Sequence, residues 1–269
     1  MPFTFKGYGM LKFRNVTLVF ILLAVLTTLF YSHLFVWLFL AVAYIAFITY
    51  GSSSISSGVF ISARCHGNRN LKQVALTFDD GPSPASTPEV LSLLKNSGVR
   101  AAFFVIGRKV EKYPDLAFRI NQDGHLIGNH SLTHADLFPL KPAAEIREEL
   151  LATRGLIEKI TGEPNLYFRP PFGVTNPIIA RALKGLDFQV IGWSIRSFDL
   201  SRRKPDVIVG RILSRLKGGD IILLHDTSPG ILPILNRLLV NLKLQGWEVV
   251  RLDKMKGFQL EKQKNTNTN

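Results

Sequence analysis

The chain has 269 residues, with 33 Lys and Arg against 20 Asp and Glu, a formal net charge of +13 and a single cysteine. One cysteine excludes an intramolecular disulfide. The positive charge suits an anionic membrane surface or an acidic glycan, whereas nucleic acid is discounted as a partner because the basic residues are scattered and no recognition-helix or aromatic-interleaved motif accompanies them.

An almost uninterrupted apolar run covers residues 16–50 and is broken only near its middle. It follows a basic flank, residues 1–15, and it is too long for one helix perpendicular to a hydrocarbon core of about 30 Å. Two short membrane helices, residues 16–31 and 34–50, fit better, and a single tilted transmembrane helix is the alternative. A cleaved signal peptide fits less well, because its apolar region is usually only about 7–15 residues long.

The flanks of the apolar run bear on which side of the membrane the rest of the chain lies. Lys6, Lys12 and Arg14 favour a cytoplasmic N-terminus. A helical hairpin would then leave the remainder in the cytoplasm, whereas a single span would export it. Residues 51–71 are expected to form a linker, flexible where Gly and Ser dominate over 51–58. The sequence therefore predicts a location at the cell or inner membrane and leaves the side open.

Extended and helical patterns then alternate over residues 72–253, which predicts a single domain. The extended segments are 73–78, 101–106, 126–127, 167–168, 189–193, 220–224 and 248–251, of which the last is expected to close the sheet. The helices are 87–96, 114–122, 143–161, 176–184, 205–216 and 230–245. This alternation indicates an α/β fold, a parallel sheet covered by helices, for which a closed barrel is one solution. The polar residues 254–269 are predicted to be a disordered tail.

Two short motifs carry the chemistry. Asp79 and Asp80 follow the first predicted strand, and His130 and His134 stand four residues apart. Asp80 with the two histidines supplies the two-nitrogen, one-oxygen ligand set that leaves coordination positions open for water and substrate. A spacing of i, i+4 would place both imidazoles on one side of a helical turn. Zinc is the expected metal, and cobalt, nickel and iron accept the same ligands.

Asp79 is the carboxylate left over beside this metal site. A carboxylate next to a metal-activated water is well placed as a general base, because the cation lowers the pKa of the water towards about 7. Taken alone, Asp-Asp-Gly-Pro is typical of a turn. The two motifs together favour a metal-dependent hydrolase.

Beyond these motifs, the chain resembles the polysaccharide deacetylases of the NodB-homology type, carbohydrate esterase family 4. Residues 77–81 and 130–134 resemble the first two motifs of that family, 169–173 the third and 222–226 the fifth. Residues 193–200 resemble the fourth motif but have Arg196 and Leu200 where an acid and a tryptophan are usual, which puts substrate preference in doubt. The resemblance covers about residues 72–253 and implies a distorted, incomplete (β/α) barrel with about seven strands.

The resemblance also implies roles for further residues. It makes Arg169 the residue that holds the base Asp79, His225 the general acid and Asp199 the residue that orients this histidine. A charged Asp199 would raise the pKa of His225 and keep it an imidazolium. Taken alone, Arg169 could be a surface cation and Asp199 a turn cap. The residues implied for substrate binding are Pro171, Phe172, Trp193 and Leu224.

These residues predict a membrane-anchored, metal-dependent hydrolase that removes N-acetyl groups from N-acetylhexosamine units of a glycan or lipid-linked glycan. The same groups could cleave an acetyl ester on a polysaccharide. The altered fourth motif suggests a third hypothesis, a non-catalytic, membrane-anchored glycan-binding protein on a former enzyme scaffold.

Overall fold

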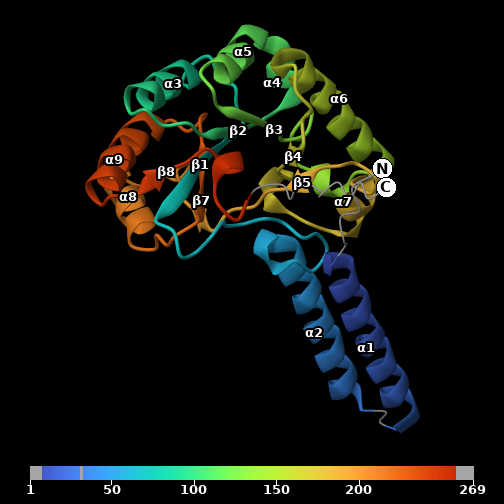
Figure 1. Cartoon of the computed structure of the whole chain (residues 1–269). Helices are drawn as coiled ribbons and strands as arrows, with labels where there is room; N and C mark the ends of the chain where they lie inside the picture. The colour runs from blue at the N-terminus through green and yellow to red at the C-terminus, as the bar shows by residue number, and fades with distance from the viewer. Residues whose placement is uncertain (1–7, 31–32, 259–269) are drawn as a thin grey trace, which may run out of the picture.

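The centre of the molecule is a curled parallel sheet (Figure 1). The structure is a computed structural model and describes residues 8–30 and 33–258. The strand order is β5-β4-β3-β2-β1-β7-β6, and β8 pairs with β1 off this path. The strands are β1 (Gln73–Asp79), β2 (Ala102–Val105), β3 (Leu126–Asn129), β4 (Tyr167–Phe168), β5 (Gln189–Val190), β6 (Ile195–Arg196), β7 (Asp220–His225) and β8 (Glu248–Val249). The expected incomplete barrel with about seven strands is confirmed.

Helices cover the outer face of the sheet (Figure 1). They are α3 (Thr87–Asn96), α4 (Gly107–Lys112), α5 (Pro114–Gln122), α6 (Ala143–Thr161), α7 (Pro177–Ala182), α8 (Pro205–Leu213) and α9 (Ile231–Leu244). The predicted bounds of α3, α5 and α6 are confirmed. Pro114 stands at the start of α5, and Gly162 ends α6 in the left-handed conformation that favours glycine.

The two faces of strand β1 have different surroundings: one faces the apolar core and the other faces the concave side of the sheet. Leu76 and Phe78 pack into the apolar core beneath the helices. Thr77 and Asp79 alternate with them and therefore face the concave side. In the register of β1 with β7, Asp79 lies opposite His225. The carboxyl ends of the two central strands thus bring a carboxylate and an imidazole side by side.

Three expectations about the domain are wrong. The segment 248–251 does not close the sheet, because β8 pairs with Gln73 and Val74 at the start of β1. Only two residues of the expected strand 189–193 pair as β5. The expected disordered tail begins too early, since Met255 and Phe258 are buried in the core on the concave side; residues 259–269 lie outside the described residues.

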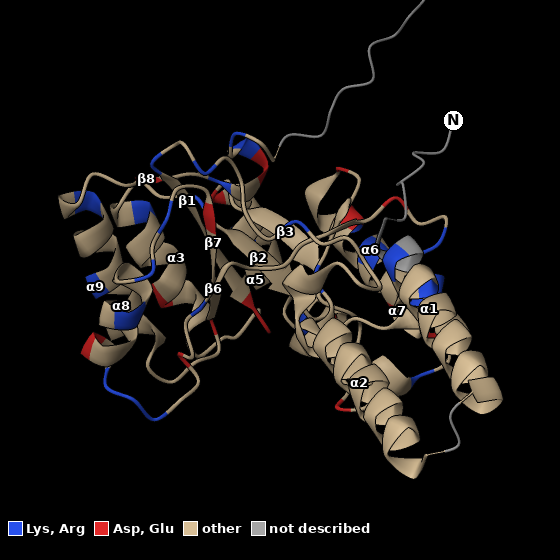
Figure 2. Cartoon of the chain, turned by 90° about the horizontal axis from the view of Figure 1, so that it is seen from below, with Lys and Arg blue, Asp and Glu red and all other residues tan. Residues whose placement is uncertain are grey.

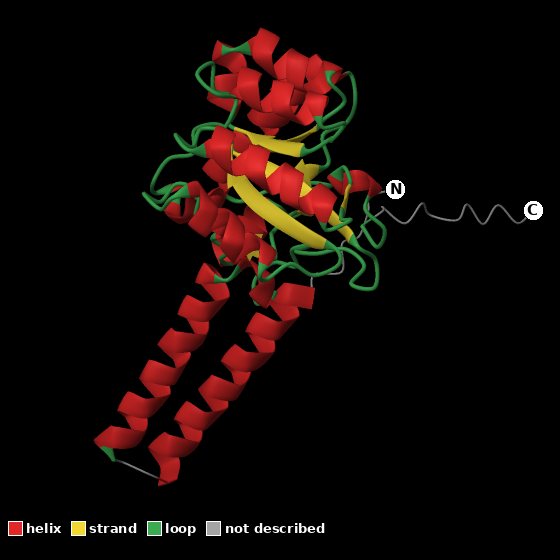
Figure 3. Cartoon of the chain, turned by 90° about the vertical axis from the view of Figure 1, so that its left-hand side faces the viewer, coloured by secondary structure: helices red, strands yellow, loops and turns green. Residues whose placement is uncertain are grey.

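Two antiparallel helices, α1 (Tyr8–Phe30) and α2 (Leu34–Ser53), project from the domain (Figure 3). Thr17 Oγ1 and the Tyr44 hydroxyl are hydrogen-bonded at 3.1 Å, which fixes the two helices side by side. Most of their large apolar side chains are exposed, and both helices are long and apolar enough to cross a membrane. The structure therefore contains the expected hairpin, with helices longer than the 16–31 and 34–50 expected.

The last turn of α2 and the segment after it are packed against the domain, so the expected flexible linker over 51–58 is wrong. The carbonyl oxygens of Gly51 and Ser52 accept hydrogen bonds from the Thr175 hydroxyl and backbone N–H, at 2.9 and 3.1 Å. Phe60 is buried and its ring lies 5.0 Å from that of Phe13 in α1. These contacts join the hairpin to the loop that follows β4.

Candidate active site

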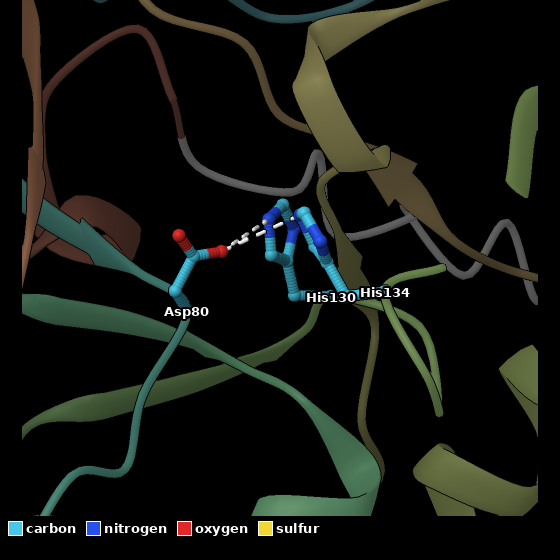
Figure 4. A group of neighbouring side chains, drawn as sticks. All are labelled: Asp80, His130 and His134. Carbon is cyan, nitrogen blue, oxygen red and sulfur yellow. Dashed lines mark ion pairs between the residues drawn. The ribbon is translucent and has the colours of Figure 1, made fainter. Parts of the chain in front are cut away.

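Three donor side chains meet at the carboxyl ends of β1 and β3 (Figure 4). The Nε2 atoms of His130 and His134 lie 3.5 and 3.4 Å from Asp80 Oδ1. The donor atoms of the three residues all lie within 4.8 Å of one another. Metal–ligand distances in proteins are about 2.0–2.2 Å for these atoms, so one cation can contact all three.

The two histidines lie on a loop, so the expected helical turn is wrong. His130 directly follows β3, and Ser131 and His134 have φ of 67° and 50°. Hydrogen bonds hold this irregular backbone: Asn129 Oδ1 accepts from Ser131 N–H at 2.9 Å, and Ser131 Oγ accepts from His134 N–H at 3.0 Å. The i, i+4 spacing predicted convergence correctly, but local side-chain hydrogen bonds produce it.

Glu149 of α6 is a buried supporting residue that the sequence did not indicate. Its carboxylate accepts hydrogen bonds from Leu132 N–H at 3.1 Å, Thr133 N–H at 3.0 Å and the Thr133 hydroxyl at 3.0 Å. Lys141 donates to it as well. Burial alone would raise the pKa of Glu149, but the hydrogen bonds from Lys141 and Thr133 lower it. A charged carboxylate therefore holds the loop between the two histidines.

Arg169 and Asp79 form a buried pair beside the donor set. Arg169 is fully buried, and its Nη1 lies 2.6 Å from Asp79 Oδ1 and 2.9 Å from Thr77 Oγ1. The other side of the guanidinium donates to the carbonyls of Ile191 and Gly192, at 3.3 and 3.0 Å. Desolvation lowers the pKa of Arg169, and Asp79 opposes that shift. Arg169 is thus a buried partner of Asp79 and no surface cation.

His225 and Asp199 form a second pair. Asp199 Oδ1 accepts from His225 Nδ1 at 2.9 Å, and Oδ2 accepts from the backbone N–H of His225 at 2.8 Å. Burial would lower the pKa of His225, but the hydrogen bond and the charge of Asp199 raise it above the ordinary value. Asp199 therefore favours the imidazolium form, whose Nε2 faces away from the bonded carboxylate.

The residues expected to bind substrate lie in two different environments. Phe172 is 45% exposed, and its ring meets that of His134 edge-on at 4.6 Å. Pro171 is buried beside it, and the ring of Trp193 lies against Gly173, so close that a Cβ there would clash with it. Phe172 therefore borders the donor set, and Pro171 and Trp193 pack within or against the third-motif loop that carries it.

Leu224 is the exception, because it points into the core beneath the helices. Side chains alternate along a strand, so Leu223 shares the concave side with His225. Leu223 lies beside Thr77 in the register of β7 with β1. The expected role of Leu224 as a wall of the acyl pocket is therefore wrong, and counting two residues back from His225 would have found Leu223.

The donor set fits a divalent cation of the zinc type. His130 Nδ1 donates to the Arg169 carbonyl at 2.8 Å, which leaves the lone pair of Nε2 directed at Asp80. Two imidazoles and one carboxylate suit zinc, cobalt, nickel and iron. Three protein donors leave positions for water and substrate, as is typical of catalytic rather than structural sites.

An open donor set beside the Arg169–Asp79 and Asp199–His225 pairs, at the carboxyl ends of a curled parallel sheet, is typical of metal-dependent hydrolases built on a (β/α) barrel. Residues 66–191 match the family model for polysaccharide deacetylase, and a peptidoglycan-N-acetylglucosamine deacetylase of Bacillus cereus is 34% identical over 205 residues, which cover 74% of this chain and 72% of that protein. The chain belongs to the polysaccharide deacetylase family, carbohydrate esterase family 4.

Two further relatives show the range of this similarity. The peptidoglycan-N-acetylmuramic acid deacetylase PdaA of Bacillus subtilis is 36% identical over 191 residues, covering 70% of this chain and 72% of that protein, and its solved structure superposes with a TM-score of 0.65, 34% identity and coverage of 72% and 84%. A family 4 pseudoenzyme from Bacillus anthracis superposes with a TM-score of 0.67 and 28% identity, covering 72% of this chain and 68% of that one. Since the family includes a pseudoenzyme, membership of the family does not by itself establish activity.

Proposed function

We propose that this protein is a metal-dependent deacetylase that hydrolyses the N-acetyl group of N-acetylhexosamine units in a glycan or lipid-linked glycan. The observation that carries the proposal is the grouping of Asp80, His130 and His134 beside the Arg169–Asp79 and Asp199–His225 pairs. The names of the relatives, which are deacetylases of N-acetylglucosamine and N-acetylmuramic acid, support an amide rather than an ester as the bond cleaved.

Asp80, His130 and His134 would hold one divalent cation, most simply zinc. A bound cation supplies Lewis-acid polarisation of the acetyl carbonyl and lowers the pKa of water. Asp79, held by Arg169 at 2.6 Å, accepts the proton of the attacking water. His225, kept protonated by Asp199, donates a proton to the departing amine nitrogen. Phe172 and Trp193 hold the sugar. Leu223, rather than Leu224, forms a wall of the acyl pocket.

The hairpin supports a membrane anchor. Helices of 23 and 20 residues match the length needed to cross a hydrocarbon core of about 30 Å. Lys12 and Arg14 lie at the end of α1 nearest the domain, and Figure 2 shows no charged residue at the far ends of the two helices. By the positive-inside rule, the domain end of the hairpin, and with it the candidate active site, lies on the cytoplasmic side.

A single experiment tests the catalytic part of this proposal. Metal content and acetate release are measured on the purified full-length protein with N-acetylglucosamine oligomers, for the wild type, Asp80→Ala and the matched control Asp115→Ala on α5. We expect about one metal ion per chain, release that a chelator stops and zinc restores, and loss of both properties in Asp80→Ala alone. Unchanged turnover in Asp80→Ala would contradict the mechanism, and bound glycan without metal would favour the glycan-binding hypothesis.

A further inference from the structure

A cationic pocket lies between the end of α2 and the altered fourth motif. It has a volume of about 300 Å³. One wall is the Ser54–Ser56 segment that follows α2, and the others are formed by Arg196 and Phe198 and by Arg211 and Arg215 on the last turn of α8 and just beyond it. Figure 2 shows Lys and Arg on the loop that leads into α8 as well.

The three arginines of this pocket have no acidic partner among the residues that the structure describes. The guanidinium carbons of Arg196 and Arg211 lie 5.2 and 4.6 Å from the centre of one ring, that of Phe198. Within residues 8–30 and 33–258, no carboxylate forms an ion pair with Arg196, Arg211 or Arg215. Arg211 Nε is buried without a hydrogen-bond partner in that same part of the chain. Arg196 and Arg215 are exposed and Arg211 is half-buried, so solvent screens part of the repulsion between these like charges, and an anion that joins them would relieve the rest.

The backbone places this cluster next to the catalytic pair. Phe198 has φ of 60° and is 40% exposed. The next residue, Asp199, is buried and bonds to His225. A left-handed residue is uncommon outside glycine, and here it turns the ring outward while the following carboxylate points inward. Phe198, which lines the pocket, and Asp199, which bonds to His225, are therefore consecutive residues of the chain.

The other wall of the pocket lies where α2 ends. Ser54 and Ser56 follow the last turn of the second apolar helix, and their hydroxyls are exposed and 3.2 Å apart. In the proposed hairpin, this is the level at which the hydrocarbon core gives way to water. Lipid phosphates lie at this level, and planar guanidinium groups with neighbouring hydroxyl donors suit their oxygens.

We propose that the pocket of Arg196, Arg211 and Arg215 binds the phosphate that links a glycan to its lipid carrier. The inference rests on the proposed deacetylase function and names its substrate class, a lipid-phosphate-linked N-acetylhexosamine rather than a free polymer. With the phosphate in the pocket and the lipid beside α2, the attached sugar extends past Trp193 towards the donor set.

Binding tests the pocket without requiring turnover. Isothermal titration calorimetry on the full-length protein in a neutral detergent uses three probes: a short-chain prenyl phosphate carrying N-acetylglucosamine, inorganic phosphate, and phosphatidylglycerol in mixed micelles. The variant is Arg211→Gln with Arg215→Gln, and the control is Lys112→Gln with Arg119→Gln, two cations of α4 and α5 far from α2 (Figure 1). Arg211→Lys with Arg215→Lys keeps the charge and removes the planar groups.

We expect the Gln pair to weaken binding of the prenyl phosphate sugar about tenfold to a hundredfold, as for the loss of charged hydrogen bonds. The Lys pair should retain an intermediate affinity and the α4–α5 control the full affinity. Inorganic phosphate should bind weakly, in competition with the glycolipid. Equal affinity for phosphatidylglycerol would identify a general phospholipid site and overturn the proposal, as would unchanged binding in the Gln pair.

Turnover separates this inference from the deacetylase function. Acetate release from the prenyl phosphate sugar should show a raised KM and an unchanged kcat in the Gln pair, while release from soluble N-acetylglucosamine oligomers should not change. Equal losses on both substrates would place the arginines in the general sugar groove and overturn the proposal. If the wild type releases acetate from neither substrate, the deacetylase function fails, and the calorimetry alone decides whether the phosphate site stands.

Discussion

Arg169 Nη1 lies 2.6 Å from Asp79 Oδ1, and neither side chain is accessible to solvent beyond a few per cent. A buried charge pair is stable only when its remaining polar atoms are also bonded. Here Thr77 and the carbonyls of Ile191 and Gly192 take the other donors of the guanidinium. The pair therefore fixes the direction of the Asp79 carboxylate relative to Asp80 and His225.

Replacing Arg169 by Lys should reduce kcat/KM about a hundredfold while metal content is retained. Lysine keeps the charge but cannot reproduce the planar set of bonds, so Asp79 loses its orientation. The matched control is Arg147→Lys on α6, whose guanidinium donates to the carbonyls of Ala182 and Lys184 away from the site. Steady-state kinetics and metal analysis of both variants test this, and equal activity in the two would show that Arg169 serves stability alone.

The fold was largely predictable because its signals are local. Strand alternation, proline at helix starts and Gly162 at a helix end each depend on a few neighbouring residues. The position of β8 depended on a long-range choice of partner strand, which no local pattern contains. The same holds for Phe258, whose burial follows from packing against distant strands and not from its polar neighbours in sequence.

The site residues that belong to short sequence motifs were predictable. The residues outside these motifs that support the site were not. The proposed metal ligands and the Arg169–Asp79 and Asp199–His225 pairs lie in short motifs, and the structure brings them together. Glu149 lies on a helix outside every motif, with nothing in its sequence neighbourhood to mark its hydrogen bonds to the histidine loop. The pocket of Arg196, Arg211 and Arg215 is formed by three segments that lie far apart in the sequence, one of them at the end of α2. No short sequence pattern contains all three.

Asp199→Asn should shift the alkaline limb of the pH–activity profile to lower pH. Asp199 raises the pKa of His225 against the lowering effect of burial, so the imidazolium proposed as the general acid persists to higher pH in the wild type. Without the charge, His225 loses its proton at lower pH, and activity falls earlier as pH rises. The profile of kcat/KM against pH measures this shift.

The control for the shift is Asp206→Asn, which removes an exposed carboxylate paired with Arg237 on the surface. It should leave the profile unchanged. A limb that stays in place in Asp199→Asn would mean that another group titrates there, and His225 would lose its assignment as the acid.

Glu149→Gln should lower the metal affinity about tenfold or more, and Glu149→Ala should lower it further. The carboxylate accepts hydrogen bonds from Leu132, Thr133 and Lys141 and so fixes the loop between the two proposed histidine ligands. Loss of such outer support typically costs about 10- to 100-fold in metal affinity. Chelator competition and the visible spectrum of the cobalt form report on ligand geometry independently of turnover. Glu148→Gln, the exposed neighbour on the same helix, is the control, and equal affinities would remove Glu149 from this role.

Truncation of Leu223 should change substrate selectivity and truncation of Leu224 should change stability, because adjacent strand residues face opposite sides of the sheet. Leu224 is fully buried beneath the helices, so Leu224→Ala should destabilise the domain by about 2–5 kcal/mol and lower its Tm, with kcat/KM of the folded protein unchanged. Leu223 lies beside Thr77 on the concave side, so Leu223→Ala should enlarge the acyl pocket. The ratio of kcat/KM for N-propionyl against N-acetyl substrate should then rise about tenfold, the scale expected for one methylene. A rise in Leu224→Ala instead would show that β7 is shifted by one residue, which would also turn His225 away from Asp79.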